Sequence, residues 1–196
     1  MNRVWVIAAS PEREAQARVL KRSIERFSPD FIHLIDPTIG YPKKTITEQV
    51  VLTRLNLALK YLESGAKDVI VLGADNFFYS DPIELAAQYA EHEALFIPHC
   101  QTWLPPPNDQ NRSLIRAGVI NSDLHVWRNT KAVRDFMRII IHEIDHGPLY
   151  NVFEVEQWWL PYALSHLNAA LIKDPGYGVA YYNLHEREIF PLVVRS

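Results

Sequence analysis

Apolar and polar positions follow one another along the chain in an order that predicts strands and helices in turn. Four short apolar runs have the length of a buried strand: residues 4–8, 31–35, 69–72 and 94–98. The run at 69–72 is apolar throughout, which indicates a strand covered on both faces. Further short strand-like segments lie near 118–120, 170–172, 179–182 and 189–194.

The segments between these runs have the spacing and the end signals of helices. Ser10, Pro11 and Glu12 place a capping residue, a proline and an acid where a first helix would begin. That helix has one apolar face, made of Ala17, Leu20, Ile24 and Phe27.

A second helix begins at a capping box, in which Thr45 is followed three residues later by Glu48, and Gly65 closes it. Its apolar side consists of Val51, Leu55, Ala58, Leu59 and Leu62. Further helices are expected over residues 81–92, 130–146 and 155–168. Because strands and helices alternate, we expect a Rossmann-like α/β fold, with a mainly parallel mixed sheet and helices on both faces. A ligand of such a sheet lies outside the carboxyl ends of the strands.

Composition narrows the class of protein further. With 196 residues, 48% hydrophobic and 22% charged, the chain has room for one domain over residues 1–196 and is not a disordered tail. A net charge of -3 disfavours binding of nucleic acid through a broad basic surface. A single cysteine, Cys100, excludes a disulfide scaffold and a four-cysteine zinc site. Without a long apolar window or a signal-like N-terminus, we expect a soluble, cytoplasmic protein with no membrane span.

An acid follows the third strand at the edge where such a sheet binds ligands. The strand at 69–72 continues into Gly73, Ala74, Asp75 and Asn76. The Asp75 carboxylate is a hard oxygen ligand, suited to Mg²⁺ or Mn²⁺ bound together with a diphosphate. The alternative is that Asp75 caps a turn, since Asp and Asn are common turn residues.

Three other segments combine polar groups that could face a cleft. Residues 117–122 place small and amide side chains on a strand, and Glu156 with Gln157 opens a helix. Residues 176–187 concentrate aromatic rings, an amide, an imidazole and a guanidinium. Each also has a purely structural interpretation, as a strand with a close backbone neighbour, a helix N-terminus and an edge strand.

A fourth motif points to different chemistry. Residues 142–146 match H-E-x-x-H, which on a helix places two imidazoles one turn apart as zinc ligands, with Glu154 or Glu156 as a third. However, Gly147 and Pro148 end the helix directly after His146, and histidines near a helix C-terminus are favoured by the helix dipole alone. A zinc hydrolase is therefore the less favoured alternative.

Taken in order, these segments resemble nucleotide-sugar glycosyltransferases of the GT-A fold, and most of all a bacterial glycosyltransferase-like group. That group has a strand ending in LDxD, an Ala-Gly-x-x-Asn segment, an Asp-Gln pair and a C-terminal signature NVAYWNLHER. The matching segments here are 72–75, 116–121, 156–157 and 178–187, with further matches at 174–177 and at 47–48 followed by Arg54. The decapeptide at 178–187 is the most specific of them.

This sequence departs from the group at four positions. Gly73 stands where the first aspartate of the acidic motif would be, which leaves Asp75 as the ligand from that motif. Glu156 replaces an aspartate, while Gly178 and Tyr182 replace asparagine and tryptophan. The change at position 73 motivates an alternative, a catalytically impaired protein that still binds the nucleotide sugar.

The resemblance implies transfer of a sugar from a nucleoside diphosphate, such as a UDP-sugar, to an acceptor hydroxyl. Asp75 and His185 would hold Mn²⁺ or Mg²⁺, which would neutralise charge on the leaving diphosphate. Glu156 would act as a base or stabilise the oxocarbenium-like sugar. The residues expected to border the nucleotide or its diphosphate are Ala8, Ala9, Ser10, Arg54, Asp75, Asn76 and Arg187.

The remaining expectations concern the sugars and the partners. Gln157 and Asn121 would bind sugar hydroxyls, and His99 with Trp103 would border the acceptor or simply pack in their loop. The acceptor class stays open among glycan, small molecule, protein and modified nucleic acid. Because the chain is short for this fold, we expect a loop, a neighbour in a homo-oligomer or another protein to complete the acceptor site.

Overall fold

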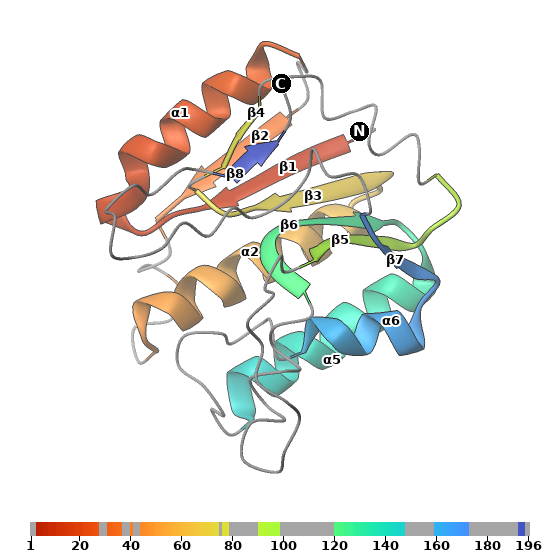
Figure 1. Cartoon of the computed structure of the whole chain (residues 1–196). Helices are drawn as coiled ribbons and strands as arrows, with labels where there is room; N and C mark the ends of the chain where they lie inside the picture. Colours follow the sequence, from red (N-terminus) through yellow and green to blue (C-terminus); the bar gives the residue numbers. More distant parts are fainter. Residues whose placement is uncertain are drawn as a thin grey trace, which may run out of the picture.

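A six-stranded sheet forms the centre of the computed structural model (Figure 1). The structure describes residues 3–27, 31–36, 40, 44–74, 76–78, 90–98, 120–147, 159–172 and 192–194. The strand order is β2-β1-β3-β6-β5-β7. The strands are β1 (Arg3–Ala8), β2 (Phe31–Ile35), β3 (Asp68–Leu72), β5 (Ala94–Pro98), β6 (Ile120–Arg128) and β7 (Ala169–Leu171).

The sheet is mixed and mainly parallel, which confirms the expected fold class. β1 pairs in parallel with β2 and β3, and β5 pairs in parallel with β7. β6 runs against both of its neighbours, β3 and β5. The reversed strand therefore brings its first residues to the edge where β1 and β3 end.

Helices cover both faces of this sheet (Figure 1). On one face lies α1 (Glu14–Glu25), which follows a short 3-10 turn, η1 (Pro11–Arg13). On the other face lie α2 (Ile46–Glu63) and α5 (Lys131–His146), with the short η3 (Leu160–Tyr162) and α6 (Ala163–His166) beside α5. None of the helices that the structure describes is long and apolar enough to cross a membrane.

Two hydrophobic cores lie on the two faces because successive strand residues point to opposite sides. In β1, Val4 and Val6 pack with α2 and α5, whereas Trp5 and Ile7 pack with α1. All four side chains are fully buried. A two-stranded parallel pair, β4 (Asn76–Phe78) with β8 (Leu192–Val194), adds Phe78 to the core on the α1 side.

Local sequence signals set the ends of the helices. The predicted capping box is present, because the Glu48 backbone N–H donates to the Thr45 hydroxyl and the Glu48 carboxylate accepts from the Thr45 backbone N–H. Thr130 caps α5 in the same way, through a bond from the Val133 backbone N–H. Gly65 ends α2 with φ at +92°, a conformation that side-chain-bearing residues rarely adopt.

At the amino end of the parallel strands, a buried carboxylate joins three strands. Asp68 is 2% exposed and accepts bonds from Arg3 of β1 at 3.2 Å and from Arg128 of β6 at 2.8 Å. Arg128 also donates to the backbone oxygen of His92. These ion pairs fix the end of the sheet opposite to the carboxyl ends of β1 and β3.

Most predicted elements are confirmed, and the differences lie in both halves of the chain. The first helix begins with the 3-10 turn η1, and the side chain of Ser10, the expected cap, makes no capping hydrogen bond. The strand expected at 118–120 is described from Ile120 and runs on to Arg128. Of the helix expected over 155–168, the structure describes only a 3-10 turn and one short helical segment from residue 160 on. Residues 81–89 and 179–182 lie outside the described residues, while residues 90–91 form a turn rather than the end of a helix.

Candidate functional site

A pocket of about 320 Å³ opens at the carboxyl ends of β1 and β3, next to the first turns of α2. Such volumes lie at the lower end of the roughly 300–1,000 Å³ found for ligand pockets, enough for part of a nucleotide sugar. The pocket is lined by Ala8, Ala9, Ser10, Arg13, Ile46, Thr47, Val50, Val51, Arg54, Gly73, Ala74 and Asp123.

Small residues at the strand ends create this space. Ala8 and Ala9 follow the large core residues of β1, and Gly73 and Ala74 follow Leu72 of β3. A larger side chain at these places would fill the volume between the strand ends and α2. The opposite wall is apolar, because Ile46, Val50 and Val51 of α2 face the pocket.

The polar groups of the pocket are two guanidinium groups, two hydroxyls and one carboxylate. Arg54 lies on α2 and is only 6% exposed, and Arg13 lies at the end of η1. Ser10 and Thr47 provide the hydroxyls, and Asp123 of β6 provides the carboxylate. Guanidinium groups bind phosphate oxygens in a bidentate manner, so Arg13 and Arg54 suit an oxyanion.

A neutral histidine lies near Arg54, in the core on the α2 side of the sheet. His125 is fully buried, and burial followed by the nearby Arg54 charge lowers its pKa well below the usual value. Trp127 Nε1–H donates to His125 Nδ1 at 2.6 Å, so the single proton of the imidazole is on Nε2. Because His125 is uncharged, Arg54 has no second positive charge from this histidine beside it.

Asp123 reaches the pocket through an irregular part of β6. Between the pairs Phe96↔His125 and Ile97↔Asn121, β5 advances one residue and β6 advances four, so residues 122–124 form a bulge. The bulge is held by Asn121, whose side-chain oxygen accepts from the Asp123 backbone N–H at 2.7 Å. Bulges of this kind redirect side chains and are frequent beside active sites.

The structure brings four of the predicted nucleotide-binding residues together in the pocket, namely Ala8, Ala9, Ser10 and Arg54. Asn121 is 1% exposed and supports Asp123, so its predicted contact with a sugar hydroxyl stays a prediction. Sequence reasoning missed Arg13 and Asp123, which carry no local motif. The predicted residues outside the described part of the chain are Asp75, His99, Trp103, Glu156, Gln157, His185 and Arg187, and only the backbone of Asn76 is described.

The H-E-x-x-H motif lies on the last turns of α5, and none of its residues lines the pocket, although Asp145 pairs with Lys44 just before α2. The rings of His142 and His146 stack with centroids 4.6 Å apart, and both residues are exposed. The helix ends at His146, as expected. Residues 148–158, with the predicted third ligands Glu154 and Glu156, lie outside the described residues.

The donor chemistry of the pocket is compatible with a divalent cation. The Asp123 carboxylate is a hard oxygen ligand of the type that Mg²⁺ and Mn²⁺ prefer. Within the described ranges, no three His, Cys, Asp or Glu side chains gather into a metal-binding group. A complete cation site would therefore need further ligands, and the sequence predicts Asp75, next to the pocket residue Ala74, and His185.

No protein-family model and no curated protein matches the chain. Solved structures do match, at low sequence identity. A glycosyltransferase involved in glycosylation of the major capsid of PBCV-1 is 11% identical, with a TM-score of 0.62 over 90% of this chain and 83% of that one. The galactosyltransferase LgtC, solved with donor and acceptor sugar analogues, is 13% identical, with a TM-score of 0.53 over 86% of this chain and 72% of its own.

A third similar structure is the glycosyltransferase GlyE of Streptococcus pneumoniae TIGR4. It is 13% identical, with a TM-score of 0.56 over 87% of this chain and 45% of its own. At these identities the likeness concerns the fold. The chain has the α/β fold of GT-A-type glycosyltransferases, and its structural neighbours are glycosyltransferases.

Proposed function

We propose that the protein is a glycosyltransferase that moves a sugar from a nucleoside diphosphate to an acceptor hydroxyl. The observation that carries the proposal is the pocket at the carboxyl ends of β1 and β3. There, Arg13 and Arg54 line the same pocket as the small residues Ala8, Ala9, Gly73 and Ala74, on a fold shared with glycosyltransferases. Ligands of open α/β sheets bind at this edge.

The described residues divide into two groups by the part of the donor that they suit. The apolar side chains of α2, Ile46 and Val50, suit the less polar parts of a nucleotide sugar. Arg13 and Arg54 suit the diphosphate, whose negative charge grows as the sugar leaves. Because Arg54 is almost fully buried, its interaction with phosphate is screened little by water.

The remaining roles fall on residues predicted from the sequence. Asp75 and His185 would hold Mn²⁺ or Mg²⁺, which stabilises a leaving diphosphate when bound. Arg187 would contact phosphate, and Glu156 with Gln157 would lie on the sugar side as base or stabilising carboxylate and as a hydroxyl ligand. We propose a UDP-sugar as the donor, and as the enzyme class a hexosyl- or pentosyltransferase.

Thermal melting against nucleoside diphosphates and nucleotide sugars, each with Mn²⁺, Mg²⁺ or EDTA, tests the proposal. A ligand at a hundred times its dissociation constant stabilises the folded state by about 2.7 kcal/mol, a shift of roughly 5–10 °C for this size of chain. If every nucleotide leaves the melting temperature unchanged, the proposal is wrong.

The matched variants are Arg54→Gln in the pocket and Arg18→Gln on the exposed side of α1, where Arg18 pairs with Glu14. A hydrogen bond to a charged group contributes about 1.5–3 kcal/mol, so Arg54→Gln should weaken nucleotide binding roughly 10- to 150-fold. Arg18→Gln should leave it unchanged. Circular dichroism at the assay temperature would establish whether both variants are folded.

A second candidate is a protein that binds the nucleotide sugar without transferring it. It is favoured by Gly73, which lines the pocket where the acidic motif would place a carboxylate. Gly73→Asp separates the two candidates, because the variant of a non-catalytic protein would gain metal affinity but no transfer. Transfer is followed as release of nucleoside diphosphate from the donor identified by melting.

A further inference from the structure

We propose that Asp123 replaces the carboxylate missing at position 73 and binds the divalent cation of the donor site, an inference that rests on the proposed function. Asp123 comes from β6, the strand next to β3, in place of an acid at position 73 directly after β3. The cation would lie between this carboxylate and the diphosphate.

The first observation is that positions 73 and 123 are neighbours across two strands. The last registered pair of β3 and β6 is Leu72↔Leu124, and the next residues along are Gly73 and Asp123. The Gly73 backbone N–H donates to the Asp123 backbone oxygen at 2.9 Å. Side chains opposite each other in an antiparallel pair have Cβ atoms only about 4.5–5.5 Å apart. An acid at either position can therefore bind a cation at the same place.

The second observation is that Asp123 is held in place by its own strand. Asn121 is buried, and its side-chain oxygen binds the Asp123 backbone N–H within the bulge of residues 122–124. Buried polar side chains that bond to the backbone fix its local conformation. The bulge thus fixes the backbone of Asp123, a residue that lines the pocket.

The third observation is the charge of the surroundings. Arg13 and Arg54 make the pocket suitable for an oxyanion, so a bound diphosphate would lie in the same 320 Å³ volume as Asp123. A divalent cation placed between Asp123 and the diphosphate is attracted to both. Carboxylate and phosphate oxygens together are the usual ligands of Mg²⁺ in nucleotide sites.

The test measures Mn²⁺ binding directly, by electron paramagnetic resonance of free Mn²⁺, with and without UDP. Asp123→Asn should weaken Mn²⁺ binding about tenfold or more, and Gly73→Asp combined with Asp123→Asn should restore most of it. Asp135→Asn on the exposed side of α5 is the control and should bind Mn²⁺ like the unaltered chain. Asn121→Ala keeps the carboxylate but frees the bulge, and it should give a smaller loss.

The results separate failure of this inference from failure of the proposed function. If Asp123→Asn binds Mn²⁺ as well as the unaltered chain while UDP still binds, the inference is wrong and the proposed function stands. If the variant loses UDP affinity equally in Mn²⁺ and in EDTA, Asp123 binds the nucleotide itself, and the cation role is again wrong. If the unaltered chain binds no nucleotide, the proposed function fails, whereas the Mn²⁺ titration without UDP still tests Asp123 as a cation ligand.

Discussion

Removing the charge of Asp68 should destabilise the sheet strongly without disturbing the pocket. Asp68 is 2% exposed and pairs with Arg3 and Arg128, whose side chains are 16% and 14% exposed. In Asp68→Asn the two guanidinium groups lose their charged partner in a place that water hardly reaches. Breaking a buried ion pair on one side costs about 3–5 kcal/mol, and the slight exposure of both arginines places this case near 3 kcal/mol.

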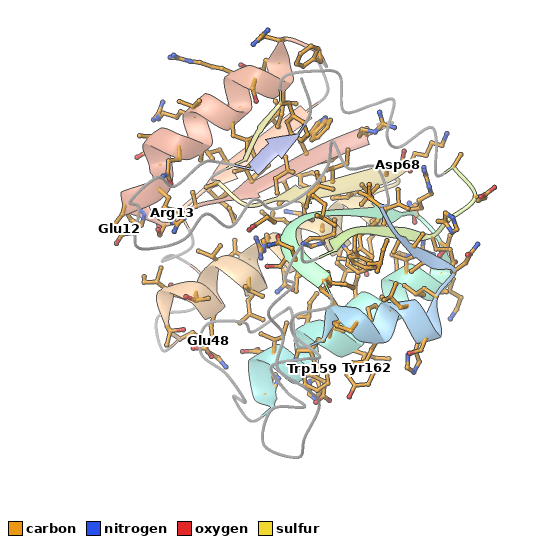
Figure 2. The ribbon with its side chains drawn as sticks, viewed as in Figure 1. Glu12, Arg13, Glu48, Asp68, Trp159 and Tyr162 are labelled. Atoms are coloured by element: carbon orange, nitrogen blue, oxygen red, sulfur yellow. The ribbon has the colours of Figure 1, made fainter. Side chains whose placement is uncertain are left out.

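The pocket should remain intact because it lies at the other end of the strands. Gly73 comes five positions after Asp68 in the chain, which at about 3.3 Å per residue is roughly 16 Å. In Figure 2, Asp68 and the pocket residue Arg13 lie at opposite ends of the sheet. Asp68→Asn should therefore bind nucleotide with the affinity of the unaltered chain at temperatures where it is folded.

Urea unfolding followed by tryptophan fluorescence measures the loss of stability, and calorimetry measures the melting temperature. For a chain of this size, about 3 kcal/mol corresponds to a decrease of roughly 6–12 °C. Asp135→Asn is the control, since Asp135 makes its ion pairs with Lys131 and Arg138 at the surface and should hardly change the melting temperature. A loss below about 1 kcal/mol in Asp68→Asn would show that the buried ion pairs do not stabilise the sheet.

Three further changes test other features of the fold. His125 is buried and neutral, and burial lowers its pKa in the folded chain. In the unfolded chain, the same imidazole takes up a proton below about pH 6.5. The free energy of unfolding should therefore fall with decreasing pH, by up to about 1.4 kcal/mol per pH unit. Urea unfolding at about pH 7.5 and about pH 5.5 should show a smaller decrease for His125→Gln, and an unchanged slope would contradict this account. In Gly65→Ala the added Cβ would meet no atom within 4 Å, so the cost comes from the positive φ alone. We expect a loss of about 1–2 kcal/mol in the free energy of unfolding, measured with urea, and a smaller loss in Gly65→Asn. Thr45→Ala removes the capping box of α2 and should cost about 0.5–2 kcal/mol in the same assay, with no effect if the cap is dispensable.

The first half of the fold could be predicted because its signals are local. The apolar runs at 31–35 and 94–98 are strands with the predicted bounds, and the capping box at Thr45 starts α2 where the spacing places it. Each of these signals depends on residues within a few positions of one another. The chain neighbours alone therefore determine the element.

The strand β6 was predicted only at its beginning because its later residues are polar. Asn121, Asp123, His125 and Arg128 do not form the apolar pattern of a buried strand. They are tolerated because the fold gives them partners: Trp127 of the same strand donates to His125, and Asp68 of β3 pairs with Arg128. Such partners are distant in sequence or depend on the fold, so periodicity does not reveal them.

The pocket residues also divide into those that the sequence predicted and those whose place depends on the fold. Ala8, Ala9, Ser10 and Arg54 were all predicted from the resemblance, in which the end of the first strand borders the nucleotide and a basic residue recurs on the helix. Asp123 was not predicted, because its place beside Gly73 follows from the antiparallel pairing and the bulge. An isolated acid within a strand has no sequence pattern that separates it from a surface residue.

The reversed strand β6 also affects when in folding the pocket forms. Its pairing with β3 joins Leu72 to Leu124, so the chain must close a loop of some fifty residues before Asp123 reaches the pocket. The walls from β1, α2 and β3 come from the first 74 residues and depend on shorter loops. Because non-local pairing is slow, we expect a partly folded chain in which three walls are present and the fourth is missing. Ligand affinity would then rise late in refolding, after most secondary structure has formed, and would serve as a probe of the docking of β6.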